Sequence, residues 1–220
     1  MRYMQGIYGI IYKEILTEFR TKYAISALML FILTSVIIVV MSIGADFKNP
    51  QMLAGLLWII LFFAASTGLT KSFVSEEEAG TSLFLKINAD NMSVYFGKLL
   101  YNIIINLLIT ALSCGLMFAI AEVNIARPAE LWVSMMFASI AISSAATIIA
   151  AIISKAGAKG AMFPVLSFPV LLPVLYLGID LTINCISGNQ PVANDIIFLI
   201  SYSGAMIAAS AVLFDFVWRE

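Results

Sequence analysis

The chain has 220 residues, of which 62% are hydrophobic and only 11% are charged. Because a soluble domain is about one quarter charged, this composition excludes an ordinary soluble domain and is typical of a polytopic helical membrane protein. The formal net charge of −1 argues against a nucleic-acid partner, and the sequence contains no histidine, the commonest metal ligand and general base.

Residues 1–22 predict an amphipathic helix. Apolar residues recur at helical spacing along one face: Met4, Ile7, Ile11, Ile15 and Phe19. Charged residues such as Lys13, Glu14 and Arg20 cluster away from that face. The segment is too short and too charged to span a bilayer, so we expect it to lie in the cytoplasmic membrane interface. Two roles stay open: a simple membrane anchor, or packing against the later spans.

The rest of the chain contains recurring apolar segments that are long enough to cross a bilayer. Hydropathy places six predicted spans at Tyr23–Gly44, Leu53–Lys71, Leu99–Ala121, Leu131–Ser154, Ala161–Ile186 and Ile196–Val217. We therefore predict an all-α polytopic membrane protein with six transmembrane helices. Residues 1–220 are expected to form a single transmembrane domain that begins with the interfacial helix.

The distribution of lysine and arginine predicts the orientation of the spans. Of the 12 such residues, only Lys48 and Arg127 fall in connections on one side, and the other ten fall on the opposite side. Cytoplasmic connections carry the excess of positive charge, so both termini are expected in the cytoplasm. In a bacterium this places the protein in the inner membrane as a multi-pass protein.

The second connection, residues 72–98, is a charged interruption between two apolar spans. A run of three glutamates ends the second span, Gly80 is expected to break the helix, and residues 81–87 predict a short cytoplasmic helix. Pattern alone leaves two interpretations open: a solvated loop, or an element that docks a soluble partner. The candidate docking residues are Glu76, Glu77, Glu78, Gly80, Thr81, Leu83 and Phe84.

The third and fourth spans carry polar and small residues. Asn102 and Asn106 lie four residues apart and share a helix face, which predicts hydrogen bonds between helices, with a substrate contact as the alternative. The fourth span is rich in alanine and serine from Ala138 onward, which predicts close helix packing.

The fifth span contains the candidates for a gate or pathway. Pro164, Pro169 and Pro173 each lack a backbone donor, so we expect a kinked or broken helix, either as a gate or as a static feature. Asp180 lies later on the same span. A carboxylate within a span is a functional candidate, although this one is also close to the outer interface.

No pattern in the sequence predicts catalysis. Aspartyl protease chemistry needs two carboxylates in one site, whereas Asp180 and Asp215 fall near opposite faces of the membrane. The nearest approach to a phosphate-binding loop, KAGAKG at residues 155–160, fails its pattern. We therefore expect no enzyme activity and no metal site in this chain, and any ATP must act on a partner.

Several stretches resemble a known family. The segment EEEAGTSLFLKINADNMSVYFGKLL, residues 76–100, is similar to the cytoplasmic coupling region of type-2 ABC exporter permeases. Within that group, four stretches resemble the CcmB family of cytochrome c maturation: GLLWIILFFAASTGLTKSF at 55–73, YFGKLL at 95–100, FPVLLPVL at 168–175 and the ending LFDFVWRE.

The resemblance implies a permease subunit that has no motor of its own. Its expected partners are a separate ABC ATPase subunit, a haem-handling membrane subunit, a periplasmic haem chaperone and a second permease copy. Haem is then a candidate substrate rather than a bound cofactor. Two alternatives remain at this point: an export permease for another substrate, and a non-transporting scaffold that relays ATPase motion.

Overall fold

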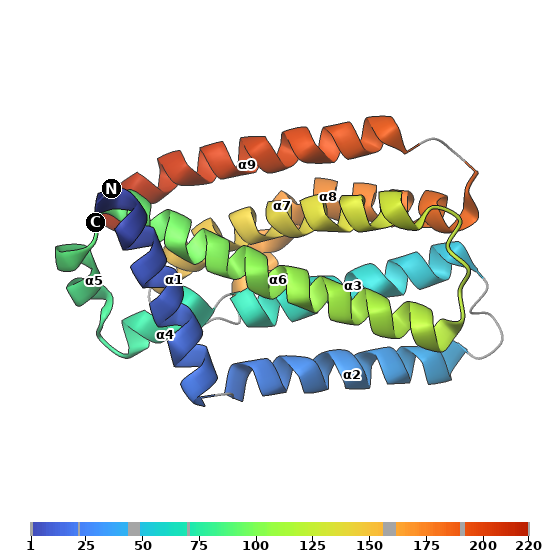
Figure 1. Ribbon diagram of the computed structural model, residues 1–220, viewed down its shortest axis with the longest axis horizontal. Coiled ribbons are helices and arrows are strands. Elements are labelled where there is room, and N and C mark those ends of the chain that lie inside the picture. The colour runs from blue at the N-terminus through green and yellow to red at the C-terminus, as the bar shows by residue number, and fades with distance from the viewer. Residues whose placement is uncertain are drawn as a thin grey trace.

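The computed structural model describes residues 2–21, 23–43, 49–69, 71–155, 162–189 and 192–219. Within these ranges every regular element is an α-helix (Figure 1). The helices are α1 (Arg2–Thr21), α2 (Tyr23–Ile43), α3 (Pro50–Leu69), α4 (Lys71–Glu78), α5 (Ser82–Asn88), α6 (Asn91–Ala121), α7 (Pro128–Lys155), α8 (Phe163–Ser187) and α9 (Ala193–Arg219).

The described helices include six that are long and apolar enough to cross a membrane: α2, α3, α6, α7, α8 and α9. This confirms the predicted number of spans and the all-α class. The largest boundary difference is at α6, which begins eight residues before the predicted span. With 31 residues, α6 is about 46 Å long at 1.5 Å per residue. Since a hydrocarbon core is about 30 Å thick, several turns of α6 extend beyond it.

Helix α7 forms the centre of the bundle. Most of its residues are buried, and α6, α8 and α9 pack around it (Figure 1). Its alanines and serines let the neighbouring backbones approach closely, as predicted. Two serine hydroxyls of α9 donate to α7 carbonyls: Ser203 Oγ to Phe137 O at 3.0 Å, and Ser210 Oγ to Ser144 O at 3.3 Å.

Amide side chains join α6 to α7. Nδ2 of Asn102 donates to Oγ1 of Thr147 at 2.9 Å, and Nδ2 of Asn106 donates to the carbonyl of Ser139 at 3.1 Å. All of these groups are buried. The two asparagines therefore make the predicted interhelical hydrogen bonds, and both amide nitrogens are used for packing.

Helix α8 is continuous from Phe163 to Ser187 although Pro169 and Pro173 lie inside it. The alternative of a broken helix is therefore wrong, and a kink stays a prediction. Pro164 lies in the first turn, where a missing N–H costs nothing because that donor has no intrahelical partner. Pro169 and Pro173 remove the donors for the carbonyls of Val165 and Pro169. Between the two prolines, the hydroxyl of Tyr202 on α9 donates to the carbonyl of Val170, so a neighbouring helix contacts the backbone of α8 there.

A close contact fixes α3 against α8. A Cβ atom at Gly178 would overlap the indole ring of Trp58, so only glycine leaves room for that ring. The buried Nε1 of Trp58 then donates to Oγ1 of Thr182 at 3.0 Å, one turn further along α8.

We predict that Gly178→Ala destabilises the protein, because the added methyl group must displace Trp58 and disturb its bond to Thr182. Overpacking of this kind costs about 1–3 kcal/mol. Gly115→Ala is the matched control, because a Cβ there meets nothing within 4 Å. The melting temperature in detergent should fall for the first variant and stay level or rise for the second. Equal melting temperatures would contradict the packing argument.

Candidate functional site

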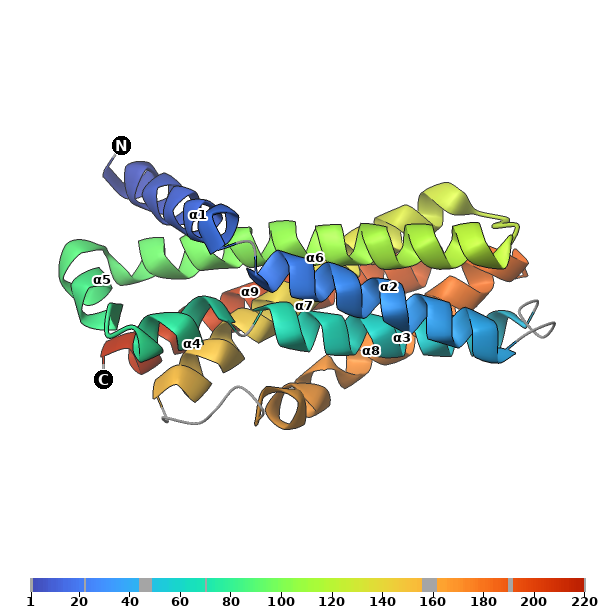
Figure 2. The same cartoon turned by 90° about the horizontal axis from the view of Figure 1, so that it is seen from below.

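Several short elements gather at one end of the bundle. Helices α1, α4 and α5, the start of α6 and the end of α9 lie at this end, which also holds the start of α1 (Figures 1 and 2). Figure 2 shows α5 at the tip of this end, beyond α4. This end carries the predicted coupling region, residues 72–98.

The turn after α4 explains why the helix stops at the glutamate run. Gly80 has φ +66°, in the left-handed region that favours glycine. Its N–H donates to the carbonyl of Glu77 at 3.1 Å, and the N–H of Thr81 donates to the carbonyl of Glu76 at 2.9 Å. These two bonds close a Schellman motif, which satisfies the last carbonyls of α4. Gly80 therefore ends α4 as predicted, and α5 starts in a new direction.

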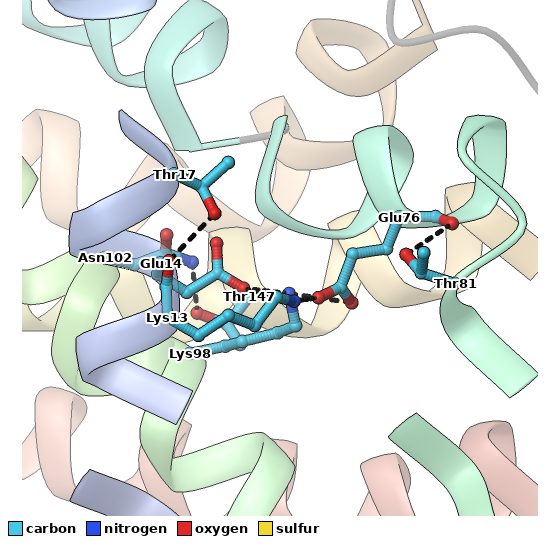
Figure 3. A network of polar contacts seen from close by, with 8 residues as sticks. All are labelled: Lys13, Glu14, Thr17, Glu76, Thr81, Lys98, Asn102 and Thr147. Atoms are coloured by element: carbon cyan, nitrogen blue, oxygen red, sulfur yellow. Dashed lines mark hydrogen bonds and ion pairs between the residues drawn. The ribbon is translucent and has the colours of Figure 1, made fainter. Parts of the chain in front are cut away.

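The central feature of this end is a buried ionic cluster made by Lys13, Glu14, Glu76 and Lys98 (Figure 3). Nζ of Lys98 lies 2.8 Å from Oε1 of Glu14 and 3.0 Å from Oε2 of Glu76. Lys13 pairs with Glu76 and lies 3.4 Å from Glu14. Two lysines and two glutamates thus neutralise one another across α1, α4 and α6.

Because the cluster is largely buried, its charges need partners within the protein. The side chain of Lys98 has no exposed surface, and Glu14 and Glu76 are 8% and 5% exposed. The ring of Phe73 covers the Lys98 ammonium, with Nζ 4.5 Å from the ring centre. Burial alone would lower the pKa of Lys13, but the hydrogen bond to Glu76 and the charges of both glutamates outweigh it and raise that pKa above 10.5. Lys13 is therefore held in its charged form at neutral pH.

Helix α1 packs on α6 beside the cluster. A Cβ atom at Gly97 would come within 2.8 Å of Ile10 Cβ, so the two backbones meet at this glycine. Ile10 is buried at the contact. Of the two roles left open for α1, packing against a later span is therefore the one observed.

The predicted apolar face of α1 is divided in the structure. Ile7, Ile11 and Ile15 are partly buried, whereas Met4 and Phe19 are exposed. The exposed apolar residues of α1 form a stripe on the side that faces away from α6: Met4, Tyr8, Tyr12, Leu16 and Phe19. Such a stripe fits a helix that lies in the membrane interface while its other side packs on protein.

The structure separates the candidate docking residues. Glu76 is buried in the ionic cluster, although a run of glutamates at a helix end suggested solvated side chains, while Glu77 is exposed. On α5, Phe84 is 70% exposed and Ile87 is 82% exposed. The side chains of Glu78 and Leu83 lie outside the described part of the structure. This end of the bundle therefore presents apolar side chains on α5, whereas Glu76 is buried.

The gate and pathway candidates lie elsewhere, on α8. Asp180 is exposed and accepts a hydrogen bond from Nδ2 of Asn184 at 3.0 Å, about two turns before α8 ends at Ser187. An apolar groove of about 430 Å³ runs between α3 and α8. Its aromatic lining residues are Trp58, Phe62, Phe63, Phe168 and Tyr176. The prolines and Asp180 are thus not brought into contact with the ionic cluster.

Reasoning from the sequence missed the partners of Glu76. Lys98 was treated as one of the cytoplasmic positive charges, and Glu14 as part of a solvated helix face. One signal was present: Lys98 stands inside the apolar stretch YFGKLLYNIII, where a lysine needs a partner. Its partner could not be identified from a local pattern, because Glu14 lies 84 residues away from Lys98 in the sequence.

Comparison with protein-family models identifies the chain over nearly its whole length. The family described as CcmB protein matches residues 5–219. The chain belongs to the CcmB family. A comparison with curated proteins finds no match.

Family membership gives the function of the chain. It is a membrane protein, the permease component of the cytochrome c maturation ABC transporter, and it is not itself catalytic. It works with the ATPase of that transporter. This selects the cytochrome c maturation permease over an export permease for another substrate, and agrees with the resemblance found in the sequence.

We predict that two neighbouring glutamates respond very differently to the same change. Glu76→Gln leaves the buried Lys98 with a single carboxylate, and removing one partner of a buried pair costs about 3–5 kcal/mol. Glu77→Gln changes an exposed group and should alter stability by less than about 0.5 kcal/mol. Thermal unfolding in detergent measures both. If both variants unfold at the wild-type temperature, the ionic cluster does not hold this end of the bundle together.

Proposed function

We propose that the ATPase subunit docks on the end of the bundle formed by α4, α5 and the start of α6, and that residues 72–98 are the coupling region. The observation that carries this proposal is α5. The Gly80 turn directs it away from α4, and its two apolar side chains Phe84 and Ile87 stand exposed at the tip of the bundle (Figure 2). A soluble partner with an apolar groove fits such an element.

The ionic cluster supports a route for motion from the docked ATPase into the membrane. The last turn of α4 leads into α5, and its Glu76 is held by Lys13 of α1 and Lys98 of α6. A displacement of α5 therefore acts on α6, which runs through the bundle against α7. Thr81 is exposed, and its N–H donates to the carbonyl of Glu76, so it stays a candidate contact residue that also positions the turn.

The same proposal places both termini in the cytoplasm of a bacterium and the chain in its inner membrane. The distribution of lysine and arginine supports this orientation. So does the position of the start of α1 and the end of α9 at the same end of the bundle as the coupling region (Figure 1). Residues 1–220 then act as one transmembrane domain, with residues 1–22 lying in the inner interface.

Further partners follow from the family's role in cytochrome c maturation. We propose a haem-handling membrane subunit and a periplasmic haem chaperone as partners, with haem as the candidate substrate, and a second permease copy beside this one. On this view α8 borders the pathway, with Pro164, Pro169 and Pro173 as candidate gate residues. The exposed carboxylate of Asp180 supports a protein or aqueous neighbour on that face, because lipid disfavours it.

Docking on α5 predicts the effect of truncating its apolar side chains. In the double variant Phe84→Ala, Ile87→Ala, the amount of ATPase that stays bound to the purified membrane complex should fall by a factor of about ten or more. Each side chain at the centre of an interface contributes more than about 1 kcal/mol to binding. The yield of c-type cytochrome should fall with it. Gly80→Pro should act alike, since proline cannot adopt a positive φ. Phe19→Ala, on the exposed stripe of α1, is the control. Full ATPase retention and cytochrome yield in the α5 variants would refute docking there.

Orientation is tested independently. Reporter fusions after Lys48, Arg127 and Gly188 should read periplasmic, and fusions at both termini and after Gly80 should read cytoplasmic. The physical reason is the scarcity of positive charge in the outer connections. A cytoplasmic reading at any of the first three positions would rule out this arrangement.

A further inference from the structure

A pair of lysines lies over one tryptophan at the cytoplasmic end. Nζ of Lys86, on α5, is 5.7 Å from the ring centre of Trp218, and Nζ of Lys155, at the end of α7, is 5.3 Å from it. The indole is only 2% exposed. Three elements that are distant in sequence therefore bring two ammonium groups together above one ring.

Lys86 and Lys155 bring two positive charges close together at this corner. Burial, followed by the neighbouring ammonium of Lys155, lowers the pKa of Lys86, and the carboxylate of Glu77 acts in the opposite direction. Among the described residues neither lysine forms an ion pair, in contrast to Lys13 and Lys98 in the neighbouring cluster. The buried Nε1–H of Trp218 also has no acceptor within the described part of the chain. Two like charges held side by side are stabilised by an anion between them.

We propose that Lys86 and Lys155 form a binding site for a carboxylate group that the ATPase subunit presents. This inference rests on the proposed function, because it assigns the chemistry of the contact beside the docking helix. Lys86 lies on α5 beside the docking face, which is formed by the exposed apolar side chains of Phe84 and Ile87. The partner surface is then an apolar groove with an acidic side chain at its edge.

The position of the site favours a protein carboxylate over a lipid phosphate. Lys86 belongs to α5, which lies at the tip of the bundle rather than along its lipid-facing sides (Figure 2). Lys86 lies about a quarter turn from Ile87 around the axis of α5, so a partner that covers Ile87 also comes close to Lys86. A headgroup approaching from the side of the bundle would reach Lys155, at the end of α7, without needing α5.

Zero-length cross-linking tests the contact directly. A water-soluble carbodiimide joins an amine to a carboxyl group only when the two are in contact. Applied to the purified membrane complex, it should link Lys86 or Lys155 to an aspartate or glutamate of the ATPase subunit, as located by mass spectrometry. The variant Lys86→Gln, Lys155→Gln should abolish this link and raise the dissociation constant for the ATPase about tenfold, as expected for two exposed ion pairs.

Matched variants separate charge from folding. Lys86→Arg, Lys155→Arg keeps both charges but removes both amines, so it should retain the ATPase and lose the cross-link. Arg20→Gln removes an exposed positive charge on α1, away from the two lysines, and should change neither the retention of the ATPase nor the cross-link. The melting temperature of each variant in detergent identifies those that fail to fold, and the arginine variant keeps the test decisive if the glutamine variant is unstable.

Three outcomes of these experiments would contradict the carboxylate site. If the glutamine variant keeps full ATPase affinity while truncation of Phe84 and Ile87 releases the ATPase, this inference is wrong and docking on α5 stands. If neither pair of changes releases the ATPase, both proposals fail. If the glutamine variant keeps the ATPase but loses binding to phosphatidylglycerol vesicles, the site takes a lipid phosphate and the inference is overturned.

Discussion

The arrangement of the end of the bundle that carries α4 and α5 depends on the burial of one ammonium group. Lys98 has no exposed surface, and an unpaired charge in such a place is very costly. Its carboxylate partners come from α1 and α4, so both helices must bring a glutamate within reach of α6 at this level. Gly97, the residue before Lys98, makes that approach possible because a side chain there would collide with Ile10. The buried charge of Lys98 requires carboxylates from α1 and α4, and Gly97 allows α1 to come close enough to α6.

A different kind of contact holds the membrane-spanning part of the bundle. Between α6, α7 and α9 the contacts are small side chains and hydrogen bonds from amides and hydroxyl groups: Asn102 donates to a hydroxyl, and Asn106 and Ser203 donate to carbonyls. Such bonds suit a hydrocarbon environment, where apolar surface alone gives little preference for one helix over lipid. The ionic contacts among the described residues lie elsewhere: one cluster joins α1, α4 and α6, and Arg127 pairs with Glu130 at the start of α7.

Local patterns predicted what local physics determines. Hydropathy located the six spans because a bilayer demands long apolar helices, and Gly80 was recognisable because a helix end after a polar run favours a residue with positive φ. The environment of Glu76 was not predictable, because its partner Lys13 is 63 residues away in sequence. Whether the prolines break α8 was left open for a similar reason, because α8 packs against residues distant in sequence, such as Tyr202, which donates to the carbonyl of Val170.

The charges at the end of the bundle that carries α4 and α5 fall into two groups with different consequences. Lys13, Glu14, Glu76 and Lys98 neutralise one another, and Lys98 and both glutamates are buried. Glu77, Lys86 and Lys155 keep their charges near the surface. Salt weakens interactions between charges that are exposed to solvent much more than it weakens buried ion pairs. Contacts made by the surface charges can therefore be reversible while α1, α4 and α6 stay joined by the buried cluster. A rigid ionic junction beneath an adaptable charged surface is therefore suited to a permease driven by a separate ATPase.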